Sequence, residues 1–142
     1  MAGPQFITPQ RPAPSRPTRR FTVSEANRSL PLVGRIVKDI VAAHQRAAQQ
    51  QKRVESARSK EQPAAQAELD RTIDRLQDLV DELSDVGVEL KDYQTGLVDF
   101  VGRHQGRDVY LCWKLGEDRI AHWHELDTGF AGRQPISKLD ER

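Results

Sequence analysis

The chain has 142 residues, a formal net charge of +1 and one cysteine, so it has room for one domain with a modest core and no internal disulfide. The first twenty residues carry four arginines and no acid, which leaves the remainder with a net charge of 1 − 4 = −3. A mildly acidic body disfavours nucleic-acid binding, which depends on a basic surface.

The segment 1–20 is rich in proline and arginine and poor in apolar residues. Packing could not offset the entropy lost on ordering it, so the composition predicts a disordered tail, with proline spacing that suits a polyproline II ligand for a protein partner. The segment lacks the apolar block of a secretory signal, and no run reaches the ~18 apolar residues of a membrane span. With Cys112 as the only cysteine, a reducing compartment and a cytoplasmic location are expected.

Order is expected from Phe21, because Thr22 and Glu25 have the spacing of a helix capping box. Pro31 follows too late to belong to the first turn of that helix. An interior proline removes a backbone hydrogen bond and clashes with a preceding carbonyl. The sequence therefore predicts a short helix over about 22–29 that breaks or kinks before a longer helix beginning near Pro31.

Two apolar seams with alternating four-three spacing predict an antiparallel helical hairpin over 22–86, closed by a loop near 59–63 and ended by Gly87. Residues 31–60 carry seven Lys and Arg against two acids, whereas residues 61–86 carry eight acids against Arg71 and Arg75. Opposite charges favour pairing of the two helices. We expect the hairpin to mediate self-association and its thinly apolar tip to be available to a protein partner. The two seams are Val33, Val37, Ile40, His44, Ala47, Gln51 and Val54, and Leu69, Ile73, Leu76, Val80 and Leu83.

After Gly87 the hydrophobic period changes to two, which is typical of strands. Four short antiparallel strands are predicted, over 88–91, 97–101, 108–115 and 119–126. A lone small sheet and a lone helical hairpin are each marginally stable, so one face of the sheet should be covered by the helices. The predicted fold class is α+β, with one domain over 21–142 whose sheet and glycine-rich loop occupy 88–136.

Unusual side chains concentrate in the last third of the chain and predict a small-ligand or anion pocket. Glycines let a backbone approach a ligand, and an arginine can bind a carboxylate or phosphate through two hydrogen bonds. The candidate ligand-binding residues are Trp113, Trp123, His124, Glu125, Asp127, Gly129, Gly132 and Arg133. The structural alternative is that both glycines adopt positive φ in a turn and that Arg133 pairs with Asp127 or Asp99.

A metal site is the second hypothesis, because His122 and His124 would lie on one side of a strand, about 6–7 Å apart. Two imidazoles suit Zn²⁺ or another divalent ion when a neighbour supplies a third ligand. Candidates for the third ligand are His104, Glu125, Asp127 and His44. Haem is a less favoured cofactor, because the chain has no Cys-x-x-Cys-His attachment motif.

Cys112 could pair with a histidine as a thiol nucleophile, but its place on a strand between Leu111 and Trp113 favours a packed core residue. We assign no catalytic residue from the sequence.

Several stretches together carry a family resemblance. They are Phe21 to Asn27 with Leu30-Pro31, Gly87 to Asp92, Gly96 to Phe100, Val109 to Glu117, and Trp123 to Pro135. Over roughly 21–136 the chain resembles the bacterial family called domain of unknown function 2203. His124 and the Gly-x-x-Gly-Arg of 129–133 match the family pattern, whereas His122 departs from it. The family has no assigned activity, so the resemblance implies no reaction.

The sequence thus predicts a cytoplasmic binding or interaction protein that forms homo-oligomers through its helical hairpin, with a ligand or anion pocket in the C-terminal segment. The alternative is a metal-binding protein or metal-dependent enzyme that uses His122 and His124.

Overall fold

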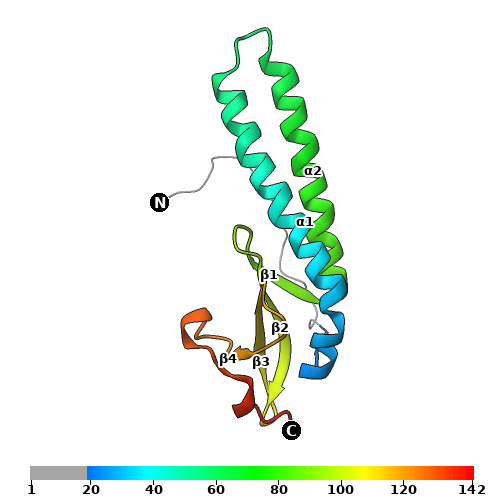
Figure 1. Cartoon of the computed structure of the whole chain (residues 1–142), viewed down its shortest axis with the longest axis vertical. Helices are drawn as coiled ribbons and strands as arrows, with labels where there is room; N and C mark the ends of the chain where they lie inside the picture. Colours follow the sequence, from blue (N-terminus) through cyan, green and yellow to red (C-terminus); the bar gives the residue numbers. More distant parts are fainter. Residues whose placement is uncertain (1–18) are drawn as a thin grey trace.

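The computed structural model describes residues 19–142, and the predicted disordered tail lies, except for its last two residues, outside this described part. Within it the predicted α+β fold is confirmed: two long helices form a hairpin, and a small antiparallel sheet follows (Figure 1). The sheet lies beside the half of the hairpin that contains the start of the first helix and the end of the second. The other half of the hairpin projects beyond the sheet (Figure 1).

The first helix, α1 (Val23–Ser56), begins with the predicted capping box. The Glu25 amide donates to Thr22 Oγ1 at 3.0 Å, and the Thr22 amide donates to Glu25 Oε1 at 2.9 Å. These two bonds satisfy amides that a helix start would otherwise leave without partners.

The predicted break before Pro31 is wrong, because α1 continues through the proline without interruption. Ala26 and Val33, on either side of Pro31, are fully buried in the main core. Tertiary packing thus holds both arms of the helix in line and outweighs the roughly 3 kcal/mol that an interior proline costs.

The second helix, α2 (Gln62–Val86), ends at Gly87, which has the predicted left-handed conformation with φ 97°. Most residues of the two predicted seams are buried inside this single chain, and the distal half of the hairpin has its own small cluster of Ala47, Val54 and Leu69. The seams therefore need no second copy to cover them, which removes the reason for expecting self-association there. The oligomeric state itself stays a prediction.

Five antiparallel strands lie in the order of the chain: β1 (Val88–Asp92), β2 (Leu97–His104), β3 (Arg107–Lys114), β4 (His122–His124) and β5 (Gln134–Pro135). Between β2 and β3, Gln105 and Gly106 both have positive φ (50° and 82°), as a two-residue type I′ hairpin turn requires. This turn fixes the register of the central strand pair.

The fourth strand is shorter than the predicted span 119–126, and β5 was not predicted. Before β4, the Ile120 amide donates to Asn27 Oδ1 of α1 at 2.8 Å instead of joining a strand ladder. After β4 the chain enters turns, and Leu126 is half exposed. The bond to Asn27 thus limits β4 at its start, and the turns after His124 limit it at its end.

The sheet has a helix-facing side and an outer side. Alternate residues of β2 and β3 point into the main core: Val98, Phe100, Val109, Leu111 and Trp113. The residues between them form the outer side, away from the helices.

The segment at the start of the described chain binds the sheet, and the C-terminal segment binds the start of α1. The Phe21 amide donates to the Val101 carbonyl at 2.8 Å, and the Arg20 guanidinium binds both oxygens of Asp108 at 2.8 and 3.1 Å. The Glu141 carboxylate accepts a hydrogen bond from the Val23 amide at the start of α1.

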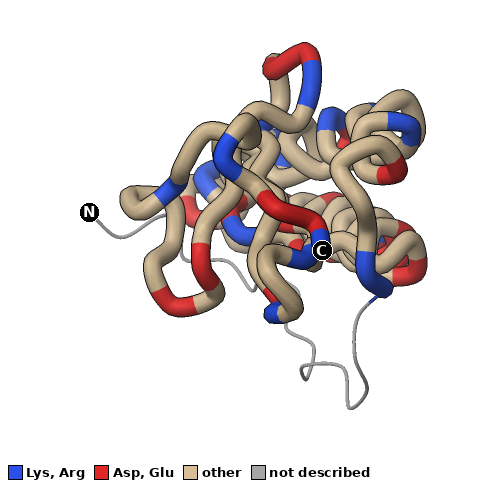
Figure 2. The backbone as a smooth tube through the Cα atoms, turned by 90° about the horizontal axis from the view of Figure 1, so that it is seen from below, with Lys and Arg blue, Asp and Glu red and all other residues tan. Residues whose placement is uncertain are grey.

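Seen from below, basic and acidic residues are interspersed over the backbone (Figure 2). Neither helix of the described part could span a membrane.

The bond between Ile120 and Asn27 is testable. In Asn27→Ala the Ile120 amide loses its acceptor in a partly buried place, so the free energy of unfolding should fall by about 1–2 kcal/mol in urea denaturation. Asn27→Asp keeps an oxygen at the same position and is the matched control. Equal losses in both variants would contradict a role for this hydrogen bond.

Candidate functional site

The register of the sheet brings a row of polar residues together on its outer side. Residues directly opposite in an antiparallel pair share a face. Glu89 pairs with Asp99, Asp99 with Cys112, and Cys112 with His122, so these four side chains cross strands β1 to β4 in one line. His124 pairs with Tyr110 in the next line.

Three of these residues form a buried cluster: Asp99 on β2, Cys112 on β3 and His124 on β4. Each is only 3% exposed. One ligand atom from each, a carboxylate oxygen, the thiol sulfur and an imidazole nitrogen, lies within 4.8 Å of the other two. Among residues 19–142 this is the group of potential metal ligands that the fold brings together.

The orientation of the His124 ring is set by the backbone. Its Nδ1 lies 2.7 Å from the Glu125 carbonyl oxygen. A carbonyl can only accept, so Nδ1 must carry the proton, and in the neutral ring Nε2 then holds a lone pair. That lone pair faces Asp99 Oδ1 at 3.3 Å. Two acceptors meet there unless a proton or a cation lies between them.

The separation of Nε2 and Oδ1 helps to distinguish these possibilities. A direct hydrogen bond between imidazolium and carboxylate is about 2.7–2.9 Å long. Two ligand atoms bonded to one tetrahedral metal at about 2.0 Å lie about 3.3 Å apart. The 3.3 Å between Nε2 and Oδ1 is longer than such a charge-assisted hydrogen bond and matches the separation of two ligands of one tetrahedral metal.

Burial controls the protonation of the cluster. It raises the pKa of Cys112 to about 12, with the neighbouring Asp99 carboxylate adding to the effect. Burial also raises the pKa of Asp99, although His124 and Lys91 oppose that shift. At neutral pH a metal-free Cys112 is a protonated thiol, which argues against the thiol nucleophile considered from the sequence.

A cavity of about 210 Å³ adjoins the cluster on the outer side of the sheet. Both Asp99 and His124 line it, and the loop that follows β4 supplies Gly129 and Phe130. The Arg133 guanidinium lies 4.0 Å from the centre of the Phe130 ring, which places a cation beside the wall of the cavity. The remaining lining residues are Lys91, Leu97, Tyr110 and Leu126.

The two tryptophans predicted as ligand-binding residues lie on the other side of the sheet. Trp113 and Trp123 are 4% and 2% exposed and belong to the main core. Trp113 Nε1 donates to the Glu117 carbonyl at 3.0 Å, and Trp123 packs on the His104 ring. Their spacing is that of core residues, and the sheet separates them from His124.

The predicted loop residues have different roles. Glu125 binds Arg107 through two hydrogen bonds of 3.0 and 2.6 Å, which lower its pKa, and Asp127 is exposed. The expected positive φ is present at Gly129 but not at Gly132. The expected ion pair of Arg133 with Asp127 or Asp99 is wrong: Asp99 pairs with His124, and Arg133 stacks on Phe130.

Gly132 is instead required by space. A Cβ atom at this position would lie 2.5 Å from Thr128 Cβ. Close packing of the loop on itself, and not an exposed anion-binding backbone, explains this glycine.

The second predicted metal ligand, His122, is half-buried on the outer side but is outside the cluster of described residues. Other candidates for the third ligand have different neighbours. His104 accepts the Asp140 amide at 2.9 Å, and His44 stacks on Tyr93 at 5.1 Å. The His122–His124 site is thus replaced by one in which His124 joins Asp99 and Cys112.

Asp99 and Cys112 were not predicted to be neighbours, although two features of the sequence indicate it. A two-residue turn at Gln105-Gly106 places residues opposite each other when their numbers sum to 211, as 99 and 112 do. An isolated acid in the apolar run Leu97 to Val101 was the second indication.

One known protein family matches most of the chain. The family described as Uncharacterized conserved protein (DUF2203) matches residues 19–136, a span that contains both helices, all five strands and the whole cluster. No curated protein and no solved structure shows a significant match to the chain. The chain therefore belongs to the DUF2203 family, as its motifs indicated.

Proposed function

We propose that the protein binds a divalent transition metal, most suitably Zn²⁺, through Asp99 Oδ1, Cys112 Sγ and His124 Nε2. The observation that carries the proposal is the direction of the His124 lone pair, which faces Asp99 because Nδ1 is committed to the Glu125 carbonyl. A backbone or carboxylate partner on the second ring nitrogen is a regular feature of histidine metal ligands.

The choice of metal follows from the ligand types. A thiolate disfavours Mg²⁺ and Ca²⁺, which take oxygen ligands, whereas sulfur, imidazole and carboxylate together suit Zn²⁺. Three protein ligands leave a fourth position for water or a small ligand. The cavity of about 210 Å³, whose wall includes two of the three ligands, supplies space for such a group.

The function supported best is thus metal-dependent binding of a small ligand on the outer side of the sheet. Metal binding would displace the thiol proton of Cys112 and neutralise the buried Asp99 carboxylate. This role requires a reduced Cys112, so the proposal includes the reducing, cytoplasmic location that the sequence predicts.

Metal binding by the tag-free protein is the first test. Zinc at 100 times its dissociation constant should stabilise the fold by about 2.7 kcal/mol, seen as a raised Tm, and native mass spectrometry should show one ion per chain. His124→Ala should weaken binding by about 100-fold or more, because a ligand is lost. His122→Ala removes the same side chain two residues away and should leave affinity unchanged.

Loss of binding in His122→Ala with retention in His124→Ala would overturn the assignment of ligands. Absence of any zinc-dependent shift in the wild-type Tm would reject the metal site itself and favour a simple Asp99–His124 ion pair.

Cobalt substitution tests the sulfur ligand separately. Co²⁺ bound to Cys112 should give a thiolate-to-cobalt charge-transfer band in the near ultraviolet, which Cys112→Ser should abolish. Asp99→Asn should weaken Co²⁺ binding but keep the band at saturating metal. A wild-type cobalt complex without the band would mean that Cys112 is only a packed core residue.

A further inference from the structure

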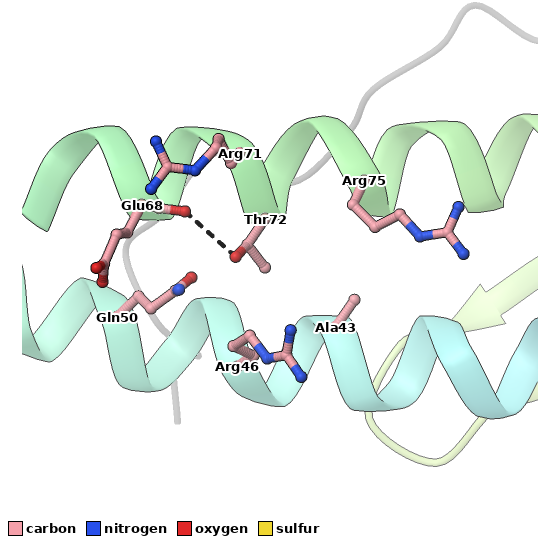
Figure 3. A pocket seen from close by; sticks show the side chains of 7 residues that line it. All are labelled: Ala43, Arg46, Gln50, Glu68, Arg71, Thr72 and Arg75. Carbon is pink, nitrogen blue, oxygen red and sulfur yellow. Dashed lines mark hydrogen bonds between the residues drawn. The ribbon is translucent and has the colours of Figure 1, made fainter.

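A second concave surface lies on the helical hairpin, in the gap between α1 and α2. It has a volume of about 340 Å³, within the range of small-ligand sites. Figure 3 shows Ala43, Arg46 and Gln50 coming from α1 and the other lining residues from α2. Those from α2 are Glu68, Arg71, Thr72 and Arg75. We call this surface the hairpin groove.

The hairpin groove has an excess of positive charge on a helix that is otherwise acidic. Arg71 and Arg75 are the only basic residues of α2, and both line the groove, as does Arg46 of α1 (Figure 3). Glu68 is the one acid in the lining, and its carboxylate lies 3.4 Å from the guanidinium of Arg53.

The three groove arginines have no ion-pair partner among residues 19–142. Arg71 and Arg75 are four residues apart on one helix, a spacing at which like charges repel each other. Collecting these positive charges therefore does not stabilise the fold in any evident way. An anionic ligand in the groove would compensate them.

Gln50 adds an independent observation. Its side-chain oxygen is buried and accepts no hydrogen bond from the described residues. A buried polar atom without a hydrogen-bond partner destabilises the folded state. If the amide is turned by 180°, its NH₂ group occupies the same place and needs an acceptor instead. In either orientation the groove lacks one polar partner that a ligand could supply.

We propose that the hairpin groove binds a small phosphorylated metabolite, with Arg46, Arg71 and Arg75 binding its phosphate oxygens and Gln50 binding a polar group of the same molecule. The guanidinium groups are spread along the groove and do not meet at one point (Figure 3). This arrangement favours a ligand with two anionic groups over a single phosphate. The site is separate from the metal cluster and does not depend on it.

Calorimetric titration with inorganic pyrophosphate tests the proposal. Arg46→Gln and Arg75→Gln should each weaken pyrophosphate binding by about 10-fold or more, the effect of losing a hydrogen bond between charged groups. Arg35→Gln removes the same charge from α1 outside the groove and should change affinity less than twofold. His124→Ala should bind pyrophosphate as the wild type does, which separates this result from any failure of the metal site.

Stability measurements without ligand give a second readout. Arg75→Gln should leave the Tm unchanged or raise it, since repulsion from Arg71 is removed. Gln50→Leu should raise the Tm and weaken pyrophosphate binding, because it removes a buried oxygen that only a ligand would satisfy.

Three results would overturn the proposal. They are no pyrophosphate binding by the wild type, an equal loss of binding in Arg35→Gln, and a marked fall in Tm in ligand-free Arg75→Gln, which would assign that arginine to the hairpin's own stability. A ten-residue polyglutamate peptide that binds more tightly than pyrophosphate would also overturn it, because the groove would then be a surface for acidic protein segments.

Discussion

The burial of the Asp99 carboxylate is the constraint on which the outer side of the sheet depends. A buried carboxylate is costly unless a cation or hydrogen-bond donors compensate it, and Asp99 is 3% exposed in the middle of β2. Its side-chain partners are the Cys112 thiol and His124, whose ring proton on Nδ1 is committed to the Glu125 carbonyl. The metal ion that we propose, held jointly with Cys112, would satisfy the carboxylate, the imidazole lone pair and the sulfur together.

The helices make this arrangement possible from the opposite side. The inner side of the sheet and the apolar stripes of α1 and α2 form one core, which holds β2, β3 and β4 at fixed register. The loop after β4 then covers part of the outer side with Gly129 and Phe130. The cluster is therefore supported by strands, while the wall of the adjoining cavity comes partly from a loop. Ligands on strands are held more firmly than ligands on loops, which suits a metal site.

Local rules predicted the fold well and the site poorly. Features that depend on neighbours in the sequence could be predicted from it. They are the capping box at Thr22, the left-handed conformation of Gly87 and the two apolar seams. Pro31 shows the limit of such rules, because packing of distant segments keeps α1 continuous. The site depends on pairing across strands: His124 was recognised, but Asp99 and Cys112 needed the register of β2 and β3. Trp113 and Trp123 attracted attention by composition, but both are buried in the main core.

The most direct measurement is anomalous diffraction at the zinc absorption edge from crystals of the full chain grown with one equivalent of Zn²⁺. The account predicts one strong peak about 2.3 Å from Cys112 Sγ and about 2.0 Å from both His124 Nε2 and Asp99 Oδ1, with the Nδ1 bond to the Glu125 carbonyl retained. A zinc peak at His122 or on the surface, with Asp99 and His124 in direct contact, would contradict it.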